Sequence, residues 1–516
     1  MEIKSSHLKF VITGLLLGML MAAMDNTIVA TAMGTIVSDL GGLDKFIWVT
    51  AAYMITVMAG MPIFGKLSDM FGRKRFFLFG LIVFLIGSAL CGIAQTMVQL
   101  SLFRALQGIG GGALMPIAFT IVFDIFPPEK RGKMTGLFGA VFGLASVLGP
   151  LLGAYITDYL SWHWVFYVNV PIGIVSFALI TAFYKESTKH HKQVIDWTGA
   201  ITLVISVISL MFALELGGHE YAWKSWQILS LFASFAVFFV IFFFTELKAK
   251  EPILPFWLFK RRLFAASQIL AFLYGCSFII LTVYIPIFVQ AVYGGSATNA
   301  GFILTPMMLG SVLGSSIGGI FQSKTSFRNL MFISFIAFFV GMLFLANMSP
   351  STPHALLILY MGIAGFGVGF SFSLLPMASI HNLEPQYRGT ANSTNTFLRS
   401  LGMTIGIAVF GSIQNNIFAD KMKEAMKSIQ QHLAGQGEQA GGNPLAKIDN
   451  VNQIFQPEYR SKIPSFILDK IIHAMSDSIT HTFLFALIPI VMTLIFIFLM
   501  GNARSVDSNK SKEKVS

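Results

Sequence analysis

Long apolar runs separated by short polar segments recur along almost the whole chain. Each run holds roughly 20 apolar residues, the length at which a helix crosses the hydrocarbon core of a bilayer. We predict fourteen such spans, at residues 8–30, 46–65, 76–94, 98–122, 134–157, 164–184, 198–216, 226–246, 264–290, 298–320, 329–347, 355–377, 389–411 and 479–500. The pattern therefore indicates an all-α integral membrane protein.

Positive charges are distributed unequally over the loops between these spans. With the N-terminus in the cytoplasm, the loops on that side hold Lys66, Arg73, Lys74, Arg75, Lys130, Arg131, Lys133, Lys185, Lys189, Lys192, Lys248, Lys250, Lys260, Arg261, Arg262, Lys324, Arg328 and Arg388. The short loops on the opposite side hold only Lys45 and Lys224. Because short cytoplasmic loops are enriched in Lys and Arg, we expect a multi-pass protein of the cell membrane with both termini in the cytoplasm.

The composition agrees with this class and excludes others. Of 516 residues, 55% are hydrophobic and 11% are charged, whereas a soluble domain carries about 25% charged residues. The net charge of +11 does not indicate nucleic-acid binding, because the cations lie in loops where membrane topology accounts for them. Cys91 and Cys276 both lie in apolar runs and are typical of buried thiols rather than a disulfide framework. No nucleotide-binding loop, catalytic triad or metal-ligand spacing is present, so we expect neither an enzyme nor a cofactor.

A charged segment, GKLSDMFGRKR, joins the second and third predicted spans. Gly65 and Gly72 permit a tight reversal, and Asp69 lies four residues before Arg73, close enough to pair with it on a helical turn. Cations alone would be typical of any cytoplasmic loop. The full pattern G-x-L-x-D-x-x-G-R-K-R resembles the signature loop between helices 2 and 3 of the major facilitator superfamily.

Two charged residues, Asp25 and Arg104, lie well inside predicted spans of the first half. Asp25 has apolar residues on both sides, and a carboxylate in such a position is costly unless it faces a cavity or a partner. Arg104 shares a helix face with Gln107 and with glycines that admit another helix. Each charge also has a structural interpretation. Asn26 or Thr27 could satisfy the Asp25 carboxylate, and Arg104 could extend to the membrane surface.

The segments around Asp25 and Arg104 also resemble motifs of the fourteen-helix drug–proton antiporters of the major facilitator superfamily. The string MDNTIVATAMGTI is similar to their first-helix motif, with Gly34 in place of a proline. The pattern R-x-x-Q-G is similar to the motif implicated in proton transfer. The resemblance implies that Asp25, Arg104 and Gln107 couple protons to substrate. It also implies that Asp124, at the cytoplasmic end of the fourth span, joins Asp69 and Arg73 in a charge network that latches the outward-facing state.

The fifth predicted span, GLFGAVFGLASVLGPLLGAYI, is rich in glycine. Glycines four residues apart allow close helix contact, and a proline within a helix bends it. Taken singly, such spacings indicate packing only. The whole segment, which ends in G-P-x-x-G, resembles the antiporter motif that distinguishes exporters from symporters. The residues of this motif are Gly143, Gly149, Pro150 and Gly153.

The spans of the second half contain no Asp or Glu. The loop from Gln322 to Asn329, which corresponds in position to the signature loop, lacks the acidic residue of that loop. Arg399 lies inside the thirteenth span, where it could hold an anionic substrate group or serve packing. Glu215, near the end of the seventh span, is a second candidate substrate contact. This charge pattern favours monocationic, neutral or zwitterionic amphiphiles over divalent cations.

The segment between the last two spans differs from the other loops. Residues 412–478 contain the Gly-rich LAGQGEQAGGNP between two helical-looking stretches, and they hold seven Lys or Arg and seven Asp or Glu. We predict two amphipathic helices around a flexible turn on the outer side. A structural cap is the favoured interpretation, and a ligand-binding domain is the alternative.

We therefore predict the major facilitator fold, with two six-helix bundles and two inserted helices, fourteen transmembrane helices in all. The expected divisions are residues 1–190 (first bundle), 191–250 (inserted helices), 251–411 (helices 9–13), 412–478 (extracellular loop), 479–502 (last helix) and 503–516 (cytoplasmic tail).

The expected function is proton-coupled antiport that exports amphiphilic drugs or toxic compounds, that is, multidrug efflux with antibiotic resistance. It requires small amphiphilic substrates, protons and a lipid bilayer, with no cofactor and no nucleic acid, and we expect a monomer. An exporter of a specific endogenous metabolite or lipid would share every feature. A symporter fits the fold but not the G-P-x-x-G segment.

Overall fold

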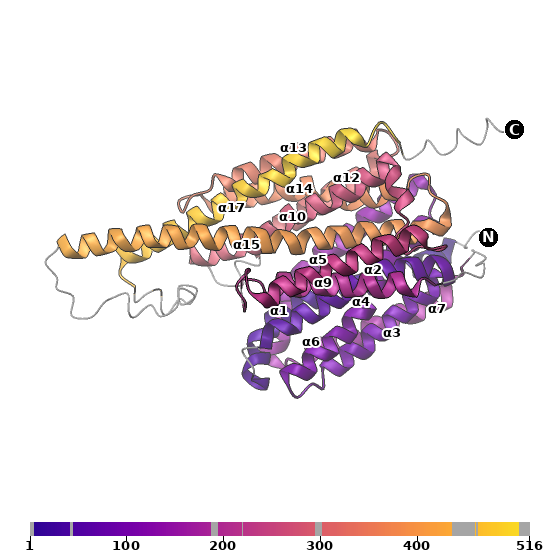
Figure 1. Ribbon diagram of the computed structural model, residues 1–516, viewed down its shortest axis with the longest axis horizontal. Helices are drawn as coiled ribbons and strands as arrows, with labels where there is room; N and C mark the ends of the chain where they lie inside the picture. Colours follow the sequence, from indigo (N-terminus) through magenta and orange to yellow (C-terminus); the bar gives the residue numbers. More distant parts are fainter. Residues whose placement is uncertain are drawn as a thin grey trace.

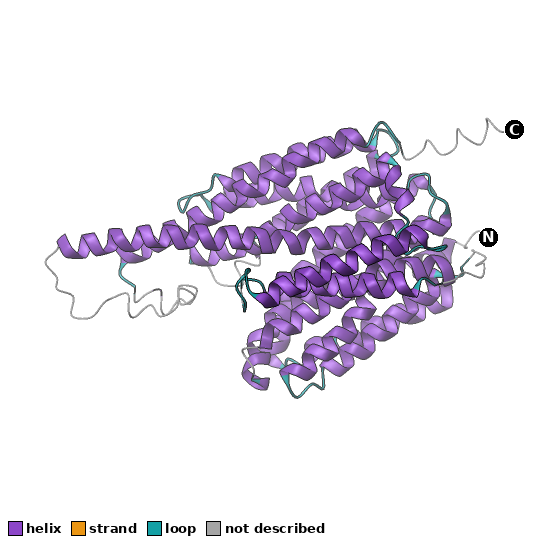
Figure 2. Ribbon diagram, in the orientation of Figure 1, coloured by secondary structure: helices purple, strands orange, loops and turns teal. Residues whose placement is uncertain are grey.

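The computed structural model describes residues 5–41, 45–186, 195–218, 220–294, 302–435, 460 and 463–504. Thirteen helices in these ranges are long and apolar enough to cross a membrane, and α12 (Thr305–Phe321) is a shorter apolar helix. Together they match the fourteen predicted spans in number and order. The expected start of the tenth span, at residue 298, lies outside the described residues. Across the described ranges the regular structure is helical and no β-strand forms (Figure 2).

The helices form two bundles of six spans, as the pattern predicted (Figure 1). The first bundle consists of α1 (Ser5–Leu40), α2 (Phe46–Phe71), α3 (Arg73–Cys91), α4 (Met97–Ile125), α5 (Pro128–Tyr159) and a sixth span made of α6 (Trp164–Tyr167) and α7 (Asn169–Phe183). The second consists of α10 (Arg262–Ala291), α12, α13 (Phe327–Ala346), α14 (His354–Ser379), α15 (Arg388–Gly435) and α17 (Ser465–Leu499). The inserted helices are α8 (Trp197–Leu216) and α9 (Trp226–Lys248), and two short helices, η2 (Phe256–Lys260) and η3 (Pro385–Tyr387), precede α10 and α15.

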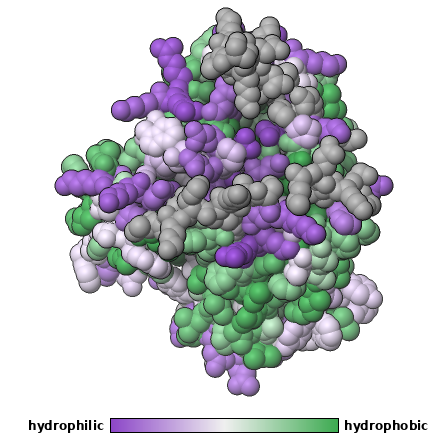
Figure 3. Space-filling view, turned by 90° about the vertical axis from the view of Figure 1, so that its right-hand side faces the viewer, coloured by the Kyte–Doolittle hydropathy of each residue, from purple (hydrophilic) through white to green (hydrophobic). Residues whose placement is uncertain are grey.

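One end of the molecule, on the right in Figure 1, holds the beginnings of α1 and α15 and the junction of α2 with α3. We call it the charged end. Figure 3 looks onto this end and shows hydrophilic side chains gathered over much of it. Gly72 joins α2 to α3 with a φ of 112°, a backbone conformation that residues with a side chain rarely adopt. The tight reversal predicted for the signature segment is therefore present and depends on Gly72.

Polar side chains begin several of the other spans. Thr96 accepts a hydrogen bond from the Gln99 N–H at the start of α4, with an N···O distance of 3.2 Å. Ser225 and Ser326 accept in the same way at the starts of α9 and α13. These caps satisfy N–H groups that have no partner within the helix.

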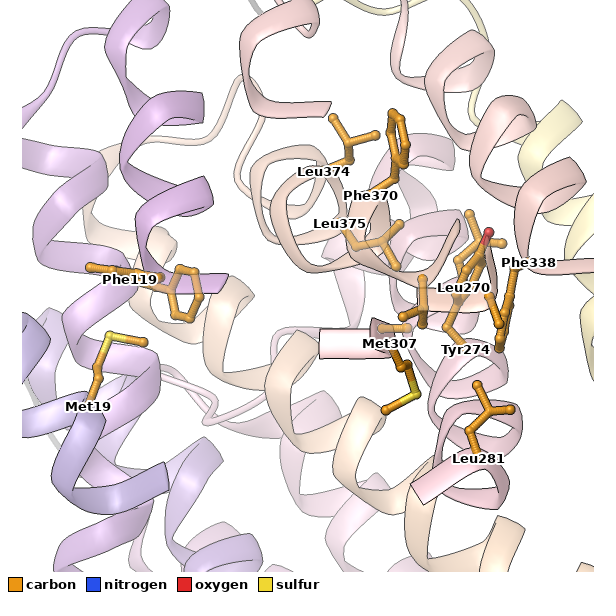
Figure 4. Close-up of a cluster of buried hydrophobic side chains, with 14 of the residues drawn as sticks. Met19, Phe119, Leu270, Tyr274, Leu281, Met307, Phe338, Phe370, Leu374 and Leu375 are labelled. Atoms are coloured by element: carbon orange, nitrogen blue, oxygen red, sulfur yellow. The ribbon is translucent and has the colours of Figure 1, made fainter. Parts of the chain in front are cut away.

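Apolar side chains from both bundles form the interior. Figure 4 shows Met19 and Phe119 of the first bundle on the left and a cluster from α10, α12, α13 and α14 on the right. Within that cluster the Tyr274 ring stacks on Phe338 with a centroid separation of 5.5 Å. The Tyr274 hydroxyl hydrogen-bonds to Ser334 Oγ at 2.8 Å, so the one polar atom of this ring is satisfied.

The bundles meet through α5 against α12 and through α2 against α15. The inserted helix α8 packs on α2, and α9 packs on α8. The surface of α9 exposes many large apolar side chains, including Val237, Phe239 and Phe244. A helix with this surface is stable where it faces lipid.

The two helices predicted within residues 412–478 are present, but each is continuous with a membrane span. α15 continues without a break from Arg388 to Gly435, and α17 begins at Ser465, so both helices run through the boundaries expected at residues 411 and 479. Both project past the other helices, on the left in Figure 1. Ile429 of α15 packs there with Ile467 and Ile471 of α17. This apolar contact allows the two helices to support each other beyond the bundle. Most of the predicted Gly-rich turn lies outside the described residues.

We predict that Gly110→Ala destabilises the protein whereas Gly34→Ala does not. A Cβ at Gly110 would overlap backbone atoms of Gly80 and Phe84 on α3, so the two helices would have to separate. A Cβ at Gly34 would meet nothing within 4 Å, and alanine favours a helix by up to about 1 kcal/mol over glycine. Thermal melting in detergent should show a lower transition for Gly110→Ala only. Equal melting of both variants would contradict the close α3–α4 packing.

Candidate functional site

Four helices bring polar side chains to one point inside the first bundle. α1 supplies Asp25, α3 supplies Ser88, α4 supplies Arg104 and Gln107, and α7 supplies Asn169. All five side chains are completely buried. We call this set the polar cluster.

An ion pair between Asp25 and Arg104 is the centre of the polar cluster. Arg104 Nη1 donates to Asp25 Oδ2 and also to Gln107 Oε1, the latter at 2.8 Å. Asp25 Oδ1 accepts hydrogen bonds from Gln107 Nε2 at 2.8 Å and from Asn169 Nδ2 at 3.0 Å. The carboxylate therefore has three side-chain donors. A buried charge pair is tolerated when further hydrogen bonds satisfy it in this way.

Further contacts surround this ion pair. The Arg104 guanidinium lies 4.1 Å from the centre of the Tyr53 ring, and Arg104 Nε donates to the Val49 carbonyl at 3.3 Å. Asn169 Nδ2 also donates to Ser88 Oγ at 3.0 Å. Within the described part of the chain, Asn169 Oδ1 is a buried acceptor without a hydrogen-bond partner.

The described hydrogen bonds of Asp25 run to Arg104, Gln107 and Asn169 rather than to Asn26 or Thr27. Arg104 is fully buried and does not extend to the surface. Thr27 does not satisfy Asp25, because its hydroxyl donates to the Met24 carbonyl at 2.9 Å. The three residues predicted to act together, Asp25, Arg104 and Gln107, are in direct contact.

Sequence reasoning missed Asn169, Ser88 and Tyr53. Asn169 stands between apolar residues in the segment WHWVFYVNVPIG. An amide inside a membrane span needs a partner, since lipid offers none, and that was the available signal. The partner lies 144 positions away in the chain, so the sequence did not indicate which residue it contacts.

The glycines of the fifth span have two different partner helices. Gly149 lies against Thr27, and Gly153 lies against Thr31 and Ile28, all on α1. Gly143 instead faces Val312 of α12, in the second bundle. Pro150 lies within α5, which continues across it. This one motif therefore packs α5 against the helix that carries Asp25 and against the opposite bundle.

The predicted charge network joins the two bundles at the charged end. Asp69 accepts a hydrogen bond from Arg73 Nη2 at 3.0 Å, and it also accepts from the backbone N–H groups of Gly389 and Thr390 at 2.9 and 2.7 Å. Gly389 and Thr390 lie in the first turn of α15, where unpaired N–H groups and the helix dipole favour an anion.

Two arginines connect this network to Asp124. Arg73 and Arg388 both form ion pairs with the Asp124 carboxylate, the second at 3.2 Å. Arg73 Nη2 also donates to the Pro385 carbonyl at 2.6 Å. Arg388 and Pro385 belong to the second bundle and were not predicted as members. Asp69, Arg73 and Asp124 are together as predicted.

Gly65 has a different role from the one predicted. It lies inside α2 and takes no part in the reversal. A Cβ at Gly65 would overlap the Ser393 side chain of α15 and come within 3.0 Å of the Gly389 carbonyl oxygen. Gly65 therefore permits the close approach of α2 to α15.

The two candidate substrate contacts lie outside the polar cluster. Arg399 is a half-buried residue of α15 whose guanidinium donates to Ser371 of α14. Glu215 is half-buried in the last turn of α8.

We predict that the stability effects of Asp25 and Arg104 substitutions are strongly non-additive. Arg104→Met leaves a buried carboxylate without its cation, and Asp25→Asn leaves a buried guanidinium without its anion; removing one partner of a buried pair costs about 3–5 kcal/mol. The double variant contains no unpaired charge and should be more stable than Arg104→Met. Thermal or denaturant unfolding in detergent measures the cycle. Additive effects would show that the two charges do not interact.

Comparisons with known proteins agree with this arrangement. The profile described as Major Facilitator Superfamily matches residues 15–407. The chain is 67% identical over 501 residues to "Multidrug resistance protein 3" of Bacillus subtilis (strain 168), covering 97% of this chain and 96% of that protein. It is 36% identical over 532 residues to "Multidrug transporter protein MdtP" of the same organism, covering 100% and 98%.

Solved structures share the fold at low sequence identity. The proton:xylose symporter XylE has a TM-score of 0.58 at 14% identity, with 80% of this chain and 90% of that chain covered. The human organic anion transporter MFSD10 has a TM-score of 0.57 at 15% identity, with 95% and 99% covered. The chain belongs to the Major Facilitator Superfamily and is a multi-pass membrane transporter of small molecules, not an enzyme.

Proposed function

We propose that this protein is a proton-coupled antiporter that exports amphiphilic drugs from the cell. The observation that carries the export of drugs is the 67% identity, over 97% of the chain, to a protein named for multidrug resistance. The polar cluster supports coupling to protons, because it places a carboxylate that can be neutralised next to a cation that cannot. The G-P-x-x-G segment of α5 supports antiport over symport.

The proton acts on the Asp25–Arg104 ion pair. When a proton from outside binds Asp25, the carboxylate becomes a neutral acid and the ion pair with Arg104 is lost. Arg104 stays charged and must find other partners, so α1 and α4 are held together less tightly. Release of the proton on the inside restores the ion pair and resets the carrier.

In this scheme Asn169 Oδ1 accepts a hydrogen bond from the O–H of protonated Asp25. An ionised Asp25 needs donors, whereas a protonated Asp25 carries an O–H that needs an acceptor. The buried Asn169 Oδ1 has no partner among the described residues, and its Nδ2 lies 3.0 Å from Asp25 Oδ1. Rotation of the amide by half a turn exchanges the two atoms and presents Oδ1 to the new O–H. Asn169 is thus a positioning residue for both states of Asp25.

The charge network sets which side is open. It ties α2 and α3 to α15, so the charged end cannot open until Asp69 leaves the first turn of α15. We propose that the charged end and both termini lie in the cytoplasm. The conformation described here is then the one that faces outward from the cell membrane. Rocking of the two bundles then alternates access to a site between them. We propose that a monomer is sufficient for this cycle.

We expect Asp25→Asn to abolish proton-coupled exchange while Asp39→Asn preserves it. Asp39 is the matched control, because it lies on the same helix but contacts Trp162 Nε1 at 2.7 Å, away from the polar cluster. Inverted vesicles with a preset pH gradient would receive lincosamides, dyes, quaternary ammonium compounds and fusidane-type anions. Wild type should dissipate the gradient with several unrelated compounds, and Asp25→Asn with none of them.

Two results would overturn this proposal. Full coupled exchange in Asp25→Asn would remove Asp25 from the proton step. No response of wild type to any compound would favour a specific endogenous metabolite or lipid as substrate, or another coupling ion.

We also predict that Asn169→Leu slows proton-coupled exchange. The variant loses a donor to the ionised form of Asp25 and the acceptor for its protonated form, and each hydrogen bond is worth about 1 kcal/mol. Exchange by Asn169→Leu would be measured in proteoliposomes with a preset pH gradient. Exchange at the wild-type rate would remove Asn169 from the proton step.

A further inference from the structure

The two bundles differ in the balance of charge inside the membrane. In the first bundle, Asp25 and Arg104 neutralise each other. The predicted spans of the second bundle contain no Asp or Glu, and Arg399 is a cation within one of them. Within the part of the chain that the structure describes, Arg399 has no ion pair, whereas Arg104 is fully paired.

Arg399 lies near the middle of the membrane. It follows Arg388, which stands at the charged end, by about 16 Å along α15 at about 1.5 Å per residue. The hydrocarbon core of a bilayer is about 30 Å thick. A side chain at this depth cannot reach either surface easily, so its charge has to be compensated inside the protein.

The described contacts of Arg399 leave part of its guanidinium available. Nη1 donates to Ser371 Oγ at 3.0 Å and Nη2 donates to the Ser371 carbonyl at 2.9 Å. Arginine has five N–H donors, so these two bonds do not exhaust it. The residue is half-buried, in contrast to the fully buried Arg104.

An aromatic surface adjoins the guanidinium. Arg399 lies 4.6 Å from the centre of the Phe372 ring, and Phe372 packs edge-on against Phe278 with centroids 5.7 Å apart. Arginine binds carboxylates through paired, charge-assisted hydrogen bonds, and aromatic faces bind apolar ring systems. α14 and α15 thus combine an anion-binding group with a surface for an aromatic body.

We propose that Arg399, Ser371 and Phe372 form a substrate site that recognises the carboxylate of an aromatic amphiphile. This inference rests on the proposed export function and narrows its substrate class. A bound carboxylate offsets the charge of Arg399 as Asp25 offsets that of Arg104. The same uncompensated charge disfavours divalent cations. Zwitterionic compounds that carry a carboxylate are therefore preferred over their esters.

Rhodamine B and its ethyl ester form a matched pair for the test, because they differ only in the carboxylate. Binding to the purified full-length protein in detergent would be measured by fluorescence anisotropy. Wild type should bind rhodamine B more tightly than the ester. Arg399→Gln should weaken rhodamine B binding at least about tenfold, which corresponds to about 1.4 kcal/mol, and change ester binding less than about twofold.

Two further variants separate recognition from a structural role. Arg399→Lys keeps the charge and should retain part of the preference for rhodamine B, although it lacks the paired donors. Ser371→Ala keeps Arg399 but removes the hydroxyl that holds Nη1, so it should weaken rhodamine B binding more than ester binding, and by less than Arg399→Gln does. If Arg399→Gln does not fold, as judged by thermal melting, the comparison of Arg399→Lys with wild type on both dyes decides the question.

Defined outcomes overturn the inference and keep it separate from the proposed function. Equal weakening of both dyes in Arg399→Gln, or no change in either, would remove Arg399 from carboxylate recognition. Export of the ester by wild type without preference for rhodamine B would leave drug export standing and refute this site. Arg399-dependent binding of rhodamine B without export of either dye would establish the site and refute the export proposal.

Discussion

The hydrocarbon interior of a bilayer offers no hydrogen-bond partners, and the architecture of this protein depends on that constraint. Backbone groups are satisfied within helices, which is why the described chain is helical throughout its spans. Polar side chains in the spans must find partners on neighbouring helices. Asp25, Arg104 and Asn169 meet this requirement together, and through them α1, α4 and α7 become one unit.

Close approach of helices follows from the same constraint. Between helices in lipid there is little hydrophobic driving force, so packing and small side chains decide which pairs associate. Gly149 and Gly153 bring α5 against α1, and Gly65 brings α2 against α15. Gly65 thus lies where Asp69 of α2 comes within hydrogen-bonding distance of the first turn of α15, although the glycine carries no chemistry itself.

At the charged end the contacts between the bundles are polar, whereas the contacts within each bundle are mostly apolar. Asp69 holds the first turn of α15 through hydrogen bonds to backbone N–H groups, and Asp124 is paired with arginines from both bundles. Such contacts can be exchanged for water without exposing apolar surface. An interface of this kind can open and close, whereas the apolar interior of each bundle stays packed.

The sequence alone determined the class of the fold, the number and order of the spans and the identity of the charged residues inside them. These depend on local properties: run length, hydropathy and the cost of a charge in lipid. It also indicated that Asp25, Arg104 and Gln107 act together, by resemblance and by the shared face of α4. Tertiary structure alone decided the partners. Asn169 contacts Asp25 across 144 positions and Thr390 contacts Asp69 across 321, and no local pattern encodes such pairings. The sequence indicated a helix after residue 411, but only the structure shows that it continues α15 and that Ile429 packs against α17. Helix periodicity fixes which residues share a face, but only the packed bundle fixes which helix that face meets.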